Sequence, residues 1–276
     1  MKLGVGWVAP MIFGLWLSCS ERAVAESGEL SVLTFGIVPQ QASEKLARDW
    51  VPLMGLLSNA VGQQIRFATA PNIPEFERRL SLGTYDIAYM NPYHFITVGQ
   101  EAGYRALVRQ KNHQLRGIIV VSSDLRFESV SELAEHSIAF PAPMAFAATL
   151  ITRSHLNTQA PGYKTTFVNS HDSVYRGVAD GLFAAGGGIV RTLQDLDPDI
   201  QSKLEVLWLS PGYTSHAIAT HPRVSDEARS QLVSAFLAVG DSESGRSLLS
   251  AIGMSGFQPA DDSDWDDVRQ LDIGKR

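Results

Sequence analysis

Apolar residues are grouped along the chain in blocks that predict strands alternating with helices. Residues 30–38 alternate and then become continuously apolar, as in a strand buried within a parallel sheet, and Pro39 ends the run. From Ser43 to Gly62 apolar residues recur at helical spacing, and 64–68 has the pattern of a second strand. Together these segments predict one βαβ unit.

The same alternation continues through the middle of the chain and stops near residue 225. Strands are expected at 85–90, 106–108, 117–122, 137–140, 165–168 and 204–209, and helices at 73–82, 92–103, 130–135, 143–156 and 173–181. This repetition predicts an α/β protein of two doubly wound lobes with mostly parallel sheets. The mainly helical remainder, 225–276, has no sheet of its own and is expected to pack on an earlier lobe.

Residues 1–25 differ from the rest of the chain. Lys2 precedes an apolar run over 5–17 that is too short to span a bilayer, a pattern typical of a signal peptide. The small residues Ala-Val-Ala at 23–25 fit cleavage after position 25, so a periplasmic location is expected. Cys19, the single cysteine, offers a lipid anchor as the alternative. Either way, the folded part has no disulfide.

Charge and spacing exclude several classes of partner. The net charge is −6 and there is no run of Lys or Arg, which argues against nucleic acid. The histidines are scattered without metal-ligand spacing, so no metal is expected. The glycines at 186–188 with Arg191 lack the Gly-Lys-Ser/Thr of a P-loop, so no nucleotide cofactor is expected. Arg191 is either a donor to an anion or a solvated surface residue.

The candidate binding residues follow the predicted strands. In open α/β sheets ligands bind at the carboxyl ends of strands, and each of these segments also leads into a helix whose free N–H groups suit an oxyanion. They are 39–41, 89–94, 140–145 and 169–173. Pro143 fits the first position of a helix, and the small residues after it would let a ligand approach the backbone.

The segment Ser170-His171-Asp172 has three interpretations. It can contact a ligand, or Ser170 or Asp172 can cap the following helix. His171 and Asp172 could also act as acid and base in an enzyme. A catalytic triad is disfavoured because adjacent residues rarely point at one another and there is no Gly-x-Ser-x-Gly elbow. We therefore expect a binding protein and not an enzyme.

Four segments in order resemble the phosphate/phosphite/phosphonate-binding (PhnD-like) family of periplasmic binding proteins. They are 86–93 (DIAYMNPY), 117–121 (GIIVV), 131–134 (SELA) before 138–143 (IAFPAP), and 170–173 (SHDS). The resemblance implies a type II periplasmic-binding-protein fold, with a hinge and a central ligand cleft. Lobe 1 would comprise 30–116 plus 222–276, and lobe 2 would comprise 117–221. It also implies a monomer that delivers a small oxyanion ligand to an ABC permease, or alternatively signals to a membrane sensor kinase.

One segment departs from the family pattern. Where phosphonate-binding members have Ser-Thr-Ser-Gly, this chain has Pro143-Met144-Ala145-Phe146, which removes hydroxyl donors and makes the site more apolar. Hydrogen bonds to a charged group contribute about 1.5–3 kcal/mol each, so other donors must replace them if an oxyanion is the ligand. The expected ligand contacts are Gln40, Tyr89, Asn91, Tyr93, Met144, Ala145, Phe146, Ser170, His171, Asp172 and Tyr175.

Overall fold

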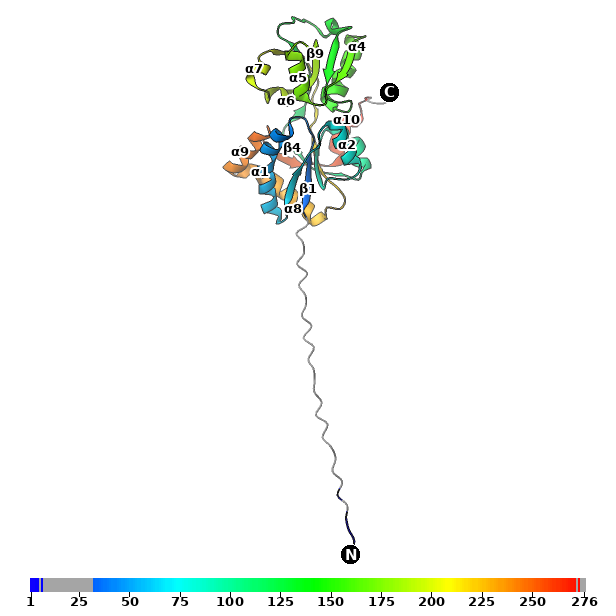
Figure 1. Ribbon diagram of the computed structural model, residues 1–276, viewed down its shortest axis with the longest axis vertical. Helices are drawn as coiled ribbons and strands as arrows, with labels where there is room; N and C mark the ends of the chain where they lie inside the picture. The colour runs from blue at the N-terminus through cyan, green and yellow to red at the C-terminus, as the bar shows by residue number, and fades with distance from the viewer. Residues whose placement is uncertain (5, 7–31, 272, 274–276) are drawn as a thin grey trace.

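The computed structural model describes residues 1–4, 6, 32–271 and 273, and it places the folded part in two lobes (Figure 1). Most of the predicted signal peptide, its cleavage position and Cys19 lie outside the described residues. Within the described part, no helix is long and apolar enough to cross a membrane.

A mixed sheet forms the first lobe, which lies lower in Figure 1. Its strands lie in the order β13 (Phe257–Pro259), β4 (Arg105–Gln110), β12 (Ala217–Thr220), β3 (Ile87–Met90), β1 (Leu33–Ile37) and β2 (Ile65–Ala68). Strands β2 and β3 pair in parallel with β1, as the βαβ pattern predicted, whereas β12 and β13 pair antiparallel. The lobe's core includes Phe35 of β1, whose ring lies 5.9 Å from that of Trp50 and 6.3 Å from that of Phe236.

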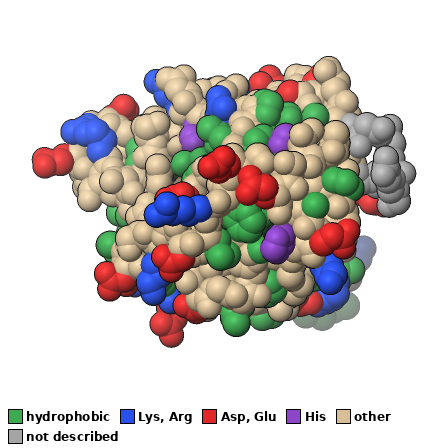
Figure 2. Space-filling view, turned by 90° about the horizontal axis from the view of Figure 1, so that it is seen from above, with side chains coloured by type: hydrophobic (Ala, Val, Ile, Leu, Met, Phe, Trp, Pro, Cys, Tyr) green, Lys and Arg blue, Asp and Glu red, His purple; other side chains and the backbone are tan. Residues whose placement is uncertain are grey.

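A second mixed sheet forms the other lobe. Its strands lie in the order β10 (Leu204–Leu209), β6 (Gly117–Ser122), β9 (Ala185–Ile189), β7 (Ser137–Phe140) and β8 (Lys164–Phe167). Strand β7 pairs in parallel with β8 and β9, whereas β6 is antiparallel to both β9 and β10. Viewed from above, basic side chains lie scattered among acidic ones on the face shown in Figure 2.

Two short strands lie where the chain passes between the lobes. Strands β5 (Gln114–Leu115) and β11 (Tyr213–Thr214) pair antiparallel and form the hinge. The chain leaves the first sheet after β4 and returns to it with β12, between β3 and β4. The predicted boundary at 221 therefore falls after β12 instead of before it, because the apolar pattern of 217–220 would suit either sheet.

The helices cover both sheets, and most begin where expected. They are α1 (Ser43–Val61), α2 (Ile73–Ser81), α3 (Pro92–His94), η1 (Phe95–Gly99), η2 (Val130–Leu133), η3 (Phe146–Ile151), α4 (Thr152–Gln159), α5 (His171–Ala179), α6 (Val190–Gln194), α7 (Pro198–Gln201), α8 (Asp226–Ala238), η4 (Val239–Asp241), α9 (Glu243–Ala251), η5 (Asp262–Trp265) and α10 (Asp266–Arg269). The helix expected from Pro143 begins instead at Phe146.

Both lobes are α/β as predicted, but their sheets are mixed and not mostly parallel. Strands β6 and β12 each follow a passage between the lobes, so each enters its sheet in the opposite direction to its neighbours. The C-terminal part packs on the first lobe as expected, and it also adds β13 to the edge of that sheet.

Candidate functional site

A small pocket lies between the lobes, where strand ends and helix starts from both lobes meet. Its free volume is about 10 Å³, about the space of one water molecule. It is lined by Val38, Gln40, Ile73, Asn91, Leu115, Ala145, Phe146, Ala147, Ala148, His171, Ile189 and His216. We call this the central pocket. Because residues of both lobes line it and it has the volume of about one water, a ligand larger than a water needs the lobes to move apart.

The start of η3 forms one wall of the central pocket and lies unusually close to strands β6 and β9 of the second lobe's sheet. The carbonyl oxygen of Ala148 lies 2.0 Å from where a Cβ on Gly187 would be, and that of Ala147 lies 2.2 Å from the same point on Gly117. Only glycine at these two strand positions allows the helix to approach the sheet so closely. The first N–H groups of a helix have no intrahelical partner, so this wall offers backbone donors to an oxyanion.

Two buried, neutral histidines face the central pocket. Burial, with a smaller effect from Arg191, lowers the pKa of His171 to about 3 and holds that of His216 well below its usual range. His216 Nε2 hydrogen-bonds the Gln40 amide at 3.0 Å, and His171 Nδ1 lies 3.4 Å from the Thr192 hydroxyl. A neutral imidazole can donate one hydrogen bond at no cost of burying a charge. The two imidazoles can therefore replace some of the hydroxyl donors that the segment 143–146 lacks.

Hydrogen bonds across the cleft hold the two lobes together. Asn91 Nδ2, in the first lobe, donates to the Met144 carbonyl at 3.1 Å, and Gln41 Nε2 donates to Asp195 Oδ2 at 3.2 Å. The Ala42 backbone also hydrogen-bonds the Asp172 carboxylate. The structure is thus a closed form of the protein.

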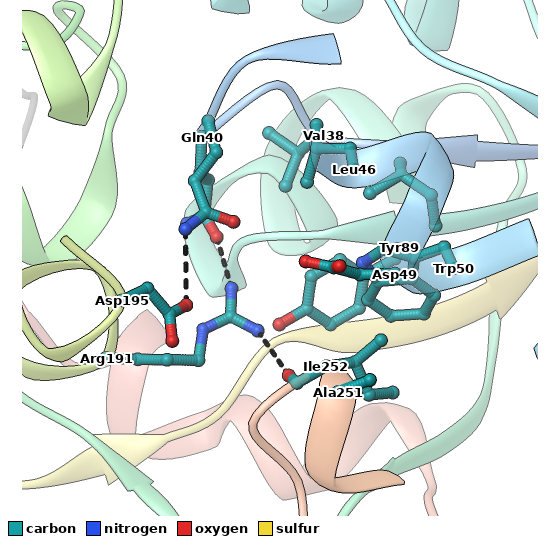
Figure 3. A pocket seen from close by; sticks show the side chains of 12 residues that line it. Val38, Gln40, Leu46, Asp49, Trp50, Tyr89, Arg191, Asp195, Ala251 and Ile252 are labelled. Atoms are coloured by element: carbon teal, nitrogen blue, oxygen red, sulfur yellow. Dashed lines mark hydrogen bonds between the residues drawn. The ribbon is translucent and has the colours of Figure 1, made fainter. Parts of the chain in front are cut away.

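Arg191 provides the strongest of these links and lies beside the central pocket. Its guanidinium donates to Gln40 Oε1 at 2.5 Å and to the Ile252 carbonyl at 3.3 Å, both in the first lobe (Figure 3). It also lies 5.8 Å from the centre of the Tyr89 ring. Arg191 is thus a part-buried residue between the lobes and not a solvated surface residue, and its role as a donor to an anion stays a prediction.

The structure places the expected contact residues in three groups. Gln40, Asn91, Ala145, Phe146 and His171 line the central pocket, and Tyr89 lines the space next to it around Arg191. Met144, Ser170 and Asp172 form the second group, which makes other contacts. The Met144 carbonyl links the two lobes, the Ser170 hydroxyl caps α5 by accepting from Ser173 N at 3.0 Å, and the Asp172 carboxylate hydrogen-bonds the Ala42 backbone.

Tyr93 and Tyr175 do not line the central pocket. Tyr175 is fully buried behind β9, where its hydroxyl donates to the Ile189 carbonyl at 2.9 Å. Tyr93 packs against the core of the first lobe. His216 is a pocket residue that the sequence reasoning missed, because it precedes a strand that returns from the other lobe and no local pattern marks it. Among the described residues, no cluster of His, Cys, Asp or Glu is placed to hold a metal ion.

The depressed pKa of His171 predicts a pH-dependent stability. The unfolded chain binds a proton at this site below about pH 6.5, whereas the folded chain does so only near pH 3, so stability is lost as the pH falls through that window. Urea unfolding between pH 6 and pH 4 should show the wild-type losing about 1.4 kcal/mol per pH unit more than His171→Gln. Equal slopes for the two proteins would contradict a buried neutral His171.

Comparisons with known proteins give a consistent result. A family model described as "ABC transporter, phosphonate, periplasmic substrate-binding protein" matches residues 35–265. PhnD1 from Prochlorococcus marinus, solved in complex with methylphosphonate, has a TM-score of 0.79 at 17% identity, covering 86% of this chain and 96% of that one. A binding protein component of an ABC phosphonate transporter from Pseudomonas aeruginosa has a TM-score of 0.79 at 18% identity, covering 88% of this chain and 85% of that one. The substrate-binding protein of an amino acid ABC transporter is more distant, with a TM-score of 0.55 at 11% identity, covering 80% of this chain and 98% of that one.

Proposed function

Since the chain belongs to the family of periplasmic substrate-binding proteins of phosphonate ABC transporters, we propose that its central pocket receives the oxyanion head of a phosphonate-type ligand. The resemblance noted in the sequence is confirmed by the family match, and the type II two-lobed fold by the structural matches. The family consists of transporter binding proteins and not of enzymes. In this proposal, closure of the lobes on the ligand creates the form that the permease recognises.

The observation that carries the proposal is the close approach of η3 to the sheet at Gly117 of β6 and Gly187 of β9. Gly117 and Gly187 let the first turn of η3 lie against the sheet, and residues 145–148 line the central pocket, so in this proposal the backbone N–H groups of that turn, rather than side-chain hydroxyls, bind the oxyanion. Backbone donors do not depend on side-chain identity. In this proposal the site binds an oxyanion although Pro143, Met144 and Ala145 replace the hydroxyl residues of other family members.

The neutral groups around this wall complete the proposed site. The Gln40 amide and the imidazoles of His171 and His216 add donors that carry no charge, and Arg191 supplies positive charge from the side. An anion in a water-poor pocket is favoured by such fixed dipoles and by one nearby cation.

A calorimetric titration with methylphosphonate tests the proposal, since that compound is bound by the Prochlorococcus protein. We expect saturable binding, and we expect Asn91→Ala to weaken it at least tenfold. The Asn91 side chain joins the lobes through the Met144 carbonyl, caps α3 by accepting from His94 N at 2.7 Å, and lines the central pocket.

Asn72→Ala is the matched control for the capping part of this effect. Asn72 caps α2 in the same way, accepting from Glu75 N at 2.9 Å, but it does not line the central pocket. We expect it to cost about 1 kcal/mol of stability and to leave the affinity unchanged. Absence of any heat change with methylphosphonate, phosphite or phosphate would overturn the proposed function.

A further inference from the structure

A larger cavity lies next to the central pocket, on the side of the hinge. Its volume is about 340 Å³, within the range of small-molecule sites. Its walls come from the hinge segment that ends in β5 and from the start of α6, with Tyr89 and Gly253 closing the side. We call this the hinge cavity.

The hinge cavity is lined by cationic and amide groups. Arg116, Arg191 and His113 line it together with three glutamines, and none of its lining residues is Asp or Glu. Burial, with a smaller effect from Arg191, lowers the pKa of His113, so His113 is a neutral hydrogen-bonding group at pH 7. The positive charge of the cavity thus comes from the two guanidinium groups.

Neither guanidinium has a carboxylate partner within the described part of the chain. Arg116 Nη1 donates to the Ser210 carbonyl at 3.1 Å, and Arg191 donates to the Gln40 amide, to the Ile252 carbonyl and to the Tyr89 hydroxyl. The nearby Asp195 instead accepts from Gln41 and lines the space on the other side of Arg191. A part-buried guanidinium that is not neutralised attracts an anion, and its fork matches a carboxylate.

The hinge cavity and the central pocket share part of their walls. Leu115, Ile189 and His216 line both spaces. The two spaces therefore adjoin at these residues, and in the inference below a ligand whose oxyanion lies against η3 places its substituent past them in the hinge cavity. The central pocket itself has about the volume of one water in this closed form, so an oxyanion bound there needs the lobes farther apart, and the hinge cavity is where a substituent finds room.

Building on the proposed function, we infer that the ligand is a phosphonate that carries a carboxylate, with the phosphonate in the central pocket and the carboxylate beside Arg116 and Arg191 in the hinge cavity. An aminoalkyl substituent would bring a third positive charge beside the two guanidinium groups and is disfavoured.

The inference is tested by calorimetry on protein purified from the periplasmic fraction, with four probes: methylphosphonate, propylphosphonate, 3-phosphonopropionate and 2-aminoethylphosphonate. We expect 3-phosphonopropionate to bind at least tenfold more tightly than propylphosphonate, which has a similar length but no charge on its substituent, and 2-aminoethylphosphonate to bind more weakly than both. Arg116→Gln should weaken 3-phosphonopropionate more than methylphosphonate and so remove most of the carboxylate's advantage. Arg66→Gln, at an exposed position of β2, should change neither.

The outcomes separate this inference from the proposed function. If methylphosphonate binds but 3-phosphonopropionate binds no more tightly than propylphosphonate, the inference is overturned and the proposed function stands. If Arg116→Gln weakens methylphosphonate and 3-phosphonopropionate equally, Arg116 has only a structural role at the hinge and the inference fails. If no phosphonate binds, both fail together.

Discussion

Gly187→Ala is expected to destabilise the protein by about 3 kcal/mol and to abolish measurable methylphosphonate binding. The new Cβ would lie 2.0 Å from the Ala148 carbonyl oxygen and 2.7 Å from the Phe140 ring, so either η3 or β9 must move. Gly187 lies in the middle of β9, between β6 and β7, and the sheet resists such a shift. The helix must then rise and carry its N–H groups away from the pocket.

Differential scanning calorimetry and titration of the variant check both parts of this prediction. A loss of 3 kcal/mol corresponds to a fall in melting temperature of roughly 6–12 °C for a protein of this size. Gly55→Ala is the matched control, because a Cβ at this helical position would meet open space, and it should leave stability equal or slightly higher. A Gly187→Ala protein that melts within 2 °C of the wild-type would show that the close approach of η3 is not required.

Trp265→Ala is expected to cost about 4 kcal/mol, the largest single effect on stability that we predict. Trp265 is fully buried, its ring centre lies 4.6 Å from that of Phe95, and its Nε1 donates to the Ser215 carbonyl at 2.9 Å. Ser215 directly follows β11. The indole thus fastens the C-terminal segment to one of the two passages between the lobes.

Trp265→Phe separates packing from this hydrogen bond. It keeps most of the contact with Phe95 and removes the donor to Ser215, so a loss of about 1–2 kcal/mol is expected. Urea unfolding of both variants measures the difference. Equal losses for Ala and Phe would mean that the hydrogen bond, and not the buried ring, makes the contribution.

The features that sequence predicted well are those that depend on neighbouring residues. Ser170 was one of the two caps that the sequence offered for the following helix, and its hydroxyl does cap α5. The order of strands and helices follows from hydrophobic periodicity in the same way. The helix predicted from Pro143 starts three residues later, because the chain needs residues 143–145 to turn onto the sheet.

The features that sequence could not predict depend on contacts between distant parts of the chain. Gln40 and Arg191 are separated by 151 positions, and Gln40 and His216 by 176, so no spacing rule connects them. The orientation of the Tyr175 side chain could not be predicted from the sequence either. It follows a segment rich in candidate contacts, yet the face of α5 that carries it is turned into the core, where burial raises the pKa of its hydroxyl above the usual range.

The insertion of the second lobe between β4 and β12 sets an order in which the protein can fold when its chain becomes available from the N-terminus onward. The second sheet is built from a continuous stretch, from β6 to β10, so it can be completed as soon as that stretch has emerged. The first sheet cannot be completed so early, because β12 lies at its centre and follows the whole second lobe in the chain. The strands that come first in the chain, β1 to β4, must therefore wait with an unpaired edge beside β3, a state that exposes strand edges to aggregation. For a chain that folds from its N-terminus onward, the lobe that starts first is the lobe that finishes last.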